Sequence, residues 1–260
     1  MAETFRDQDL RNAEFESADL TGATFHHTHL NGVTFRNVDM TGMRVLDADL
    51  VDVEITGQVR NLTINGVDVT DYVEGQLDRR YPGREQMRPT DPAGFREAWN
   101  LLEGLWSGTV ERARILEARR PGSLHDSVDG EWSFVQTLRH LVYATEVWVL
   151  RALHGDPRPW HPLSLPFDEM EPHPEVPWDR AARPSLDEVL ALRADRQAVV
   201  RRVVDELTDE QLRGRTTPVE GPSWPPADAY PVREVLLTIL HEEWEHRRYA
   251  ERDLSVLESL

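Results

Sequence analysis

The chain has 260 residues, of which 47 are acidic and 29 are basic, so its formal net charge at neutral pH is -18. Such a surface repels nucleic acids and anionic membranes, and neither is an expected partner. The chain has no cysteine, which excludes disulfide bonds, thiolate metal sites and a cysteine nucleophile. Any metal must therefore be held by histidines and carboxylates, and any thiol chemistry must use the sulfur of a second molecule.

The length allows two modest domains with a buried core. No apolar stretch reaches membrane-spanning length, and the first residues lack the charged and apolar segments of a secretion signal. We therefore expect a cytoplasmic protein.

The first part of the chain repeats every five residues. One phase of the repeat holds only apolar residues: Phe5, Leu10, Phe15, Leu20, Phe25, Leu30, Phe35, Met40, Val45, Leu50 and Ile55. Neither a helix nor a strand has a period of five. A short fixed period indicates a stacked coil in which each turn buries its central residues against the next.

Two of these segments, Ala18-Asp19-Leu20-Thr21-Gly22 and Ala48-Asp49-Leu50-Val51-Asp52, closely resemble the pentapeptide-repeat pattern A(D/N)LXX. The resemblance implies a short right-handed quadrilateral β-helix over residues 1–57. It implies little about function. Some members of that family mimic DNA and bind topoisomerases such as gyrase, but they are long rods, and a docking or capping role suits this short segment better.

Residues 58–90 form a predicted capping or linker segment. Two short extended runs flank Asn65-Gly66, a dipeptide typical of a tight hairpin. A short helix is expected over 72–80, before Pro82-Gly83 ends it.

Residues 91–260 contain four long predicted helices. The first begins after Asp91-Pro92 and runs to about residue 118. The second and third begin at serines with Gln or Glu three residues later, a capping box; they cover about 133–154 and 185–207. The fourth covers about 231–258. Four such helices with apolar faces predict an all-α four-helix bundle, a fold that builds metal sites from facing helices.

The fourth predicted helix carries Glu242 and His246, four residues apart and hence on one face. The same face is otherwise largely apolar. A carboxylate and an imidazole there are costly unless something pairs with them, and a divalent metal is one suitable partner. This pair is the most informative functional feature of the sequence.

The second predicted helix offers a third ligand, His140. Ala144 and Trp148 continue its face, which suggests that the face points inward. A single histidine on such a face is more often a hydrogen-bonded core residue than a metal ligand, and this alternative stays open.

Thr137-Leu138-Arg139-His140-Leu141 and His246-Arg247 resemble the ligand segments of the DinB superfamily of metal-binding four-helix bundles. Glu242 stands where that superfamily commonly has histidine. The set His/Glu/His is similar to that of mycothiol-dependent maleylpyruvate isomerase relatives. The resemblance covers residues 91–260 and implies a divalent metal bound by His140, Glu242 and His246.

Other residues are candidates for lesser roles. His241 is an alternative ligand, but it lies five residues from His246 and so points elsewhere on a helix. His161 and His173 are alternative ligands from a long loop. Asp253, one heptad after His246, could orient the His246 ring or simply pair with an arginine.

Two long connectors, 156–184 and 214–229, are rich in proline and contain Trp160, Trp178 and Trp224. Long loops in compact domains are often lids or binding loops. These tryptophans could line a substrate pocket above the metal or merely cover the bundle ends, and the sequence does not decide between the two.

The resemblance implies a metal-dependent enzyme that uses a low-molecular-weight thiol such as mycothiol to conjugate or isomerise a small electrophile. Zinc is the first choice of metal, with nickel, iron or manganese as alternatives. No catalytic residue is assigned beyond the ligands. Two alternatives remain: a hydrolase that uses metal-bound water, and a non-catalytic interaction protein with a structural metal. Residues 1–90 are a candidate docking segment, and no oligomeric state is predicted.

Overall fold

The computed structural model describes residues 4–168, 170–222 and 224–260. The chain divides into two compact units, Met1–Gly57 and Gln58–Leu260. No helix in the described part of the chain is both long enough and apolar enough to cross a membrane.

The first unit repeats its backbone conformation every five residues. One residue in each repeat has a positive φ angle: Asp7, Asn12, Ser17, Gly22, His27, Gly32, Asn37, Gly42, Asp47, Asp52 and Gly57. Glycine, asparagine and aspartate adopt this left-handed conformation more readily than other residues do. The five-residue sequence period therefore corresponds to a five-residue period of turns.

Side chains and main chain support these turns. The amide of Ala13 donates to the carbonyl of Leu10, and the same bond recurs ten residues later between Ala23 and Leu20. The Asp19 carboxylate accepts from the amide of Thr21, which closes a local side-chain turn.

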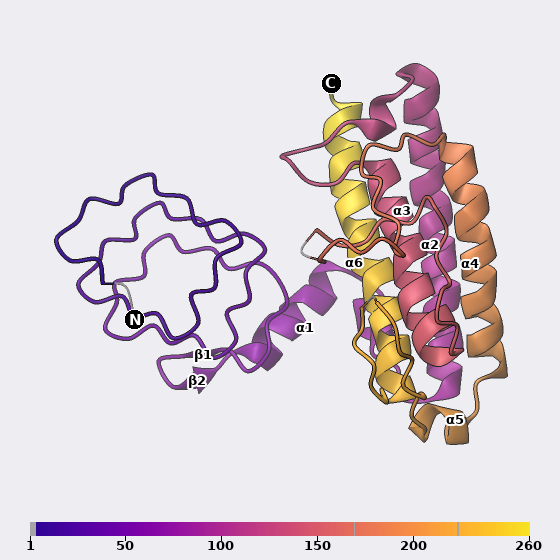
Figure 1. Ribbon diagram of the computed structural model, residues 1–260, viewed down its shortest axis with the longest axis horizontal. Helices are drawn as coiled ribbons and strands as arrows, with labels where there is room; N and C mark the ends of the chain where they lie inside the picture. Colours follow the sequence, from indigo (N-terminus) through magenta and orange to yellow (C-terminus); the bar gives the residue numbers. More distant parts are fainter. Residues whose placement is uncertain (1–3, 169, 223) are drawn as a thin grey trace. The chain divides into compact units, whose positions relative to one another are not determined.

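The expected burial of the central residues is wrong in this structure. Phe15, Leu20 and Phe25 are 62%, 47% and 61% exposed. Residues 4–57 contain no β-strand, and the unit forms no closed β-helix. The chain winds in wide loops (Figure 1), so the turns recur without the close stacking that would bury these side chains. A local turn requires only its own residues, whereas stacking requires neighbouring coils to pair.

The second unit begins with the predicted hairpin and short helix. Strands β1 (Thr63–Ile64) and β2 (Val67–Asp68) pair in antiparallel fashion across Asn65-Gly66, whose φ angles of 49° and 80° suit a tight hairpin turn. Helix α1 (Thr70–Arg80) and the 3-10 turn η1 (Arg84–Met87) follow.

The described part of the second unit contains six α-helices. Two of them are short: α1, which the sequence predicted, and α5 (Asp209–Arg213), which it did not. The four long helices lie side by side (Figure 1): α2 (Pro92–Arg119), α3 (Phe134–Thr145), α4 (Leu186–Glu206) and α6 (Val232–Glu258). A short 3-10 turn, η2 (Ser123–His125), follows α2.

The predicted helix starts are confirmed by their caps. The Asp91 side chain accepts from the amide of Gly94 at 2.8 Å at the start of α2. Ser133 and Gln136 bond each other's amides at the start of α3, as a capping box requires. These bonds satisfy amides that the first helical turn leaves without partners, so short sequence patterns suffice to place the starts.

The second predicted helix changes its geometry halfway. After α3 the chain continues as a π-helix, η3 (Glu146–Leu153), in which the amide of His154 bonds the carbonyl of Val149 rather than that of Leu150. The predicted helix over about 133–154 is therefore present, but its second half is a π-helix. In this geometry the side chains of Glu146 and Arg151 are both buried.

The four long helices pack around a shared core. Helix α2 contacts α4 and α6, and α3 contacts the same two helices. Trp99, Phe95 and Leu236 are almost fully buried in this core. The bundle is thus a rigid scaffold on which α3 and α6 face each other.

One buried ion pair ties α4 to α6. Nη2 of Arg193 lies 2.8 Å from Oε2 of Glu243, and their side chains are 4% and 2% exposed. The Arg193 guanidinium also lies over the Trp106 ring. Removing one partner would leave a buried charge without compensation.

We expect Glu243→Ala to lower the free energy of unfolding of the helical unit by about 3–5 kcal/mol, because Arg193 loses its buried partner. Urea unfolding of the metal-free protein, followed by far-UV circular dichroism, measures this. The control is Glu234→Ala, an exposed glutamate of the same helix, for which a change within about 0.5 kcal/mol is expected. Equal effects of the two variants would contradict the importance of the pair.

Candidate metal centre

Three predicted ligands meet between α3 and α6. His140 comes from α3, and Glu242 and His246 come from α6; one potential ligand atom of each lies within 4.8 Å of the others. Oε2 of Glu242 is 3.4 Å from Nε2 of His140 and 3.3 Å from Nδ1 of His246. The two imidazole rings stack with their centroids 4.8 Å apart. Glu242 and His246 come together through the helical i, i+4 spacing, and the α3–α6 packing adds His140.

Main-chain carbonyls orient both imidazole rings. Nδ1 of His140 lies 3.0 Å from the carbonyl oxygen of Leu165, and Nδ1 of His246 lies 3.0 Å from that of Glu242. Because a carbonyl only accepts, each Nδ1 must carry the proton. In the neutral form of each ring the lone pair is then on Nε2, where a metal would be bound.

The Glu242 side chain is 24% exposed, but one oxygen of its carboxylate is fully buried. Its Oε2 atom has no hydrogen-bond partner. Burial raises the pKa of Glu242, whereas a proton on Nε2 of His140, 3.4 Å from Oε2, followed by a positive charge on the His246 ring, lowers it to about 2. Burial, followed by the nearby His140, lowers the pKa of His246 to about 4. At neutral pH the site thus offers a carboxylate and an unprotonated His246 ring.

These residues fit a divalent cation. An anionic oxygen with no donor and inward-facing imidazole nitrogens are typical ligands of zinc and of other first-row metals. Within the described residues, no fourth histidine, aspartate or glutamate joins the cluster. Three protein ligands leave coordination positions for another molecule, as in catalytic sites.

The alternative ligands lie elsewhere. His241 bonds the side chain of Gln58 through Nε2. His161 accepts from the amide of Leu163, and His173 from that of Glu175. None of the three histidines belongs to the cluster found among the described residues.

The remaining candidates have separate contacts. Asp253 is buried and forms an ion pair with Arg252 at 2.6 Å. Of its two expected roles, pairing with an arginine is therefore the one observed. Trp160 stacks on Tyr143, whose ring centroid is 6.3 Å from that of His140. Trp178 stacks under Arg180, whereas Trp224 is 46% exposed and contacts Phe167. Of the three tryptophans, Trp160 thus has the clearest link to the metal site.

Sequence reasoning missed two aromatic neighbours of the site. The Trp132 ring lies 4.5 Å from that of His140 and 6.1 Å from that of His246. Tyr249 contacts His246 edge-on at 5.9 Å. Helical i, i+3 spacing could have identified Tyr249. Trp132 precedes the helix, and its position depends on how the preceding loop folds back.

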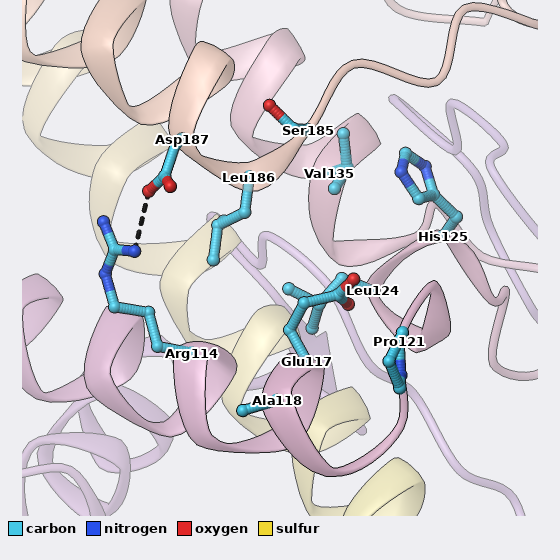
Figure 2. A pocket seen from close by; sticks show the side chains of 10 residues that line it. All are labelled: Arg114, Glu117, Ala118, Pro121, Leu124, His125, Val135, Ser185, Leu186 and Asp187. Atoms are coloured by element: carbon cyan, nitrogen blue, oxygen red, sulfur yellow. Dashed lines mark hydrogen bonds and ion pairs between the residues drawn. The ribbon is translucent and has the colours of Figure 1, made fainter.

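Two surface hollows lie apart from the three ligands. One of about 420 Å³ has polar and apolar walls and the Arg114–Asp187 ion pair at 2.7 Å (Figure 2). The other, of about 590 Å³, lies between α2 and α4. Neither lining includes His140, Glu242 or His246. The three clustered ligands therefore lie outside both hollows.

The depressed pKa of His246 predicts an acid-sensitive metal-free protein. Its folded-state pKa of about 4 lies below the ordinary 6.5, so protons bind the unfolded chain more readily. This contribution to stability is fully present above about pH 6.5 and is lost as the pH falls to about 4.

Unfolding midpoints measured across that range should therefore depend less on pH in His246→Gln than in the wild type. His173→Gln, which changes an exposed histidine, is the control and should follow the wild-type curve. Identical pH profiles for all three proteins would rule out a perturbed His246.

Comparison with known proteins supports the assignment of both parts of the chain. A model of the DinB superfamily matches residues 69–250, and a model of pentapeptide repeats, in eight copies, matches residues 4–37. No curated protein and no solved structure matches the chain. The first match spans well over half of the chain and includes all three clustered ligands. The chain belongs to the DinB superfamily and carries pentapeptide repeats at its N-terminus.

Proposed function

We propose that the protein is a metal-dependent enzyme that activates a low-molecular-weight thiol for attack on a small electrophile. The observation that carries this proposal is the cluster of His140, Glu242 and His246, in which the buried Oε2 of Glu242 has no hydrogen-bond partner. Burying a charged oxygen without a partner is energetically costly, and a bound cation would remove that cost.

Each ligand has a defined part in holding the cation. His140 and His246 supply neutral nitrogen donors whose orientation is set by carbonyl oxygens. Glu242 supplies one negative charge, which lowers the net charge of the centre. A bound divalent cation would supply the acidity that makes a thiol or water ionise at neutral pH.

The surroundings favour a reaction centre over a structural one. Structural zinc sites usually have four protein ligands, whereas this cluster has three among the described residues. Trp132 contacts the His140 ring, and Tyr249 contacts the His246 ring edge-on. An aromatic wall of this kind also suits a small organic substrate.

The thiol must come from a second molecule, because the chain has no cysteine. In the proposed reaction the thiol gives up its proton, and its sulfur forms a bond to an electrophilic carbon. A transferase reaction then expels a leaving group that takes the bonding electrons. An isomerase reaction instead breaks the same carbon–sulfur bond after the substrate has rearranged. Mycothiol is the proposed thiol and zinc the proposed metal.

The metal site is tested first by elemental analysis. The purified wild type should contain one divalent ion per chain, and His140→Ala and His246→Ala should each lose it, because two ligands hold a cation weakly. The control is His173→Ala, which should retain the metal. Circular dichroism should show unchanged helix content, since the apolar core is separate from the ligands. Full metal content in both ligand variants would refute the site.

The thiol reaction is tested with panels of thiols and electrophiles. Wild-type protein should consume an electrophile only when thiol and metal are both present. Glu242→Gln keeps the shape of the side chain but removes its charge, so metal affinity and turnover should fall about 10-fold or more, with little change in stability. Metal-dependent hydrolysis without thiol would favour a hydrolase. Tight metal binding without any reaction would favour a structural metal in an interaction protein.

A further inference from the structure

Arg139, the residue before His140 in α3, is a buried cation whose hydrogen bonds go to main-chain oxygens. Its side chain is 0% exposed. Nε donates to the carbonyl of Leu163 at 2.7 Å, and the two terminal nitrogens donate to the carbonyls of Ala182 and Asp179. Burying a charge is costly, and here the cost is offset by hydrogen bonds to these three carbonyls. The arginine therefore fixes the positions of the segments that carry the carbonyls.

The three carbonyls belong to two distant parts of one connector. Leu163 lies near the start of the 156–184 loop, and Asp179 and Ala182 lie near its end. One planar guanidinium with donors in fixed directions therefore joins both parts of the loop to α3.

The same loop orients a metal ligand. The amide of Leu165 donates to the carbonyl of Arg139 at 3.2 Å, and the carbonyl of Leu165 accepts from Nδ1 of His140 at 3.0 Å. Leu165 is fully buried, so water does not compete for these bonds. The position of one carbonyl thus decides which nitrogen of His140 carries the proton.

Glu146 attaches the same part of the loop to the bundle through a second set of bonds. The buried carboxylate of Glu146 accepts from the hydroxyl of Ser164 and from the amide of His161, and Arg196 neutralises it at 2.7 Å. Residues 161–165 are therefore held from both Arg139 and Glu146.

We propose that Arg139 is a positioning residue for the metal centre. By clamping the 156–184 loop, it places the Leu165 carbonyl so that His140 keeps its proton on Nδ1 and presents Nε2 to the cation. The inference rests on the proposed metal site but does not depend on thiol transfer.

The chain offers a matched control in Arg151. This arginine is 1% exposed and donates to the carbonyls of Val219, Gly221 and Pro225 in the other long connector. It is buried like Arg139 and donates to loop carbonyls in the same way, although its Nε has no partner. In the described part of the chain, none of its hydrogen bonds involves a ligand or Leu165. Arg139→Lys and Arg151→Lys should therefore cost comparable stability.

The test measures zinc affinity by competition with a chromophoric chelator and the His140 tautomer by nitrogen NMR of the metal-free protein. The His140 signals are assigned by their absence in His140→Gln. We expect Arg139→Lys to weaken zinc binding about 10–100-fold and to shift His140 toward the form protonated on Nε2, because a misplaced outer partner misorients its ligand. Arg151→Lys should keep the wild-type affinity and tautomer.

Wild-type zinc affinity and tautomer in Arg139→Lys would overturn the proposal, as would equal losses in both lysine variants. If Arg139→Lys does not fold, Glu146→Gln loosens the same loop from its other attachment and should shift the same two readouts. Unchanged readouts in that variant would also overturn the proposal. A wild type that binds no zinc but shows the Nδ1-protonated His140 would refute the metal function and leave the positioning role of the loop intact.

Discussion

The metal centre depends on a carboxylate held between two imidazoles at the α3–α6 interface. Oε2 of Glu242 is buried and has no hydrogen-bond partner, and Nδ1 of each flanking ring lies against a main-chain carbonyl. With both Nδ1 atoms engaged, the rings cannot turn to satisfy the carboxylate by themselves. A divalent cation would resolve this conflict, because it could be bound by all three side chains at once.

Around this centre, buried arginines hold helices and irregular loops in place. The Arg193–Glu243 pair links α4 to α6, and Arg139 and Arg151 bind the carbonyls of the two long connectors. Loop carbonyls cannot bond to one another, so donors from a rigid helix are needed to bury them. The connectors are thus attached parts of the bundle, and the sequence-based suggestion that they serve as lids receives no support from these contacts.

Local patterns in the sequence predicted the local features well. The caps at Asp91 and Ser133 and the Asn65-Gly66 hairpin depend on neighbouring residues, and all appear as expected. The five-residue repeat predicted the spacing of the turns but not the exposure of Phe15 and its equivalents. Stacking of coils is a contact between distant residues, and a repeat pattern does not determine how closely they approach.

The sequence by itself determined that Glu242 and His246 share a helix face, because a turn of helix brings residues four apart together. His140 could be proposed from its inward-facing side of the second predicted helix and from resemblance, but nothing local brings α3 to α6. The tertiary structure decided the rest: the meeting of the three ligands, the approach of Trp132, and the Leu165 carbonyl that orients His140. These contacts join residues far apart in the chain, and packing of the whole bundle is what sets their distances.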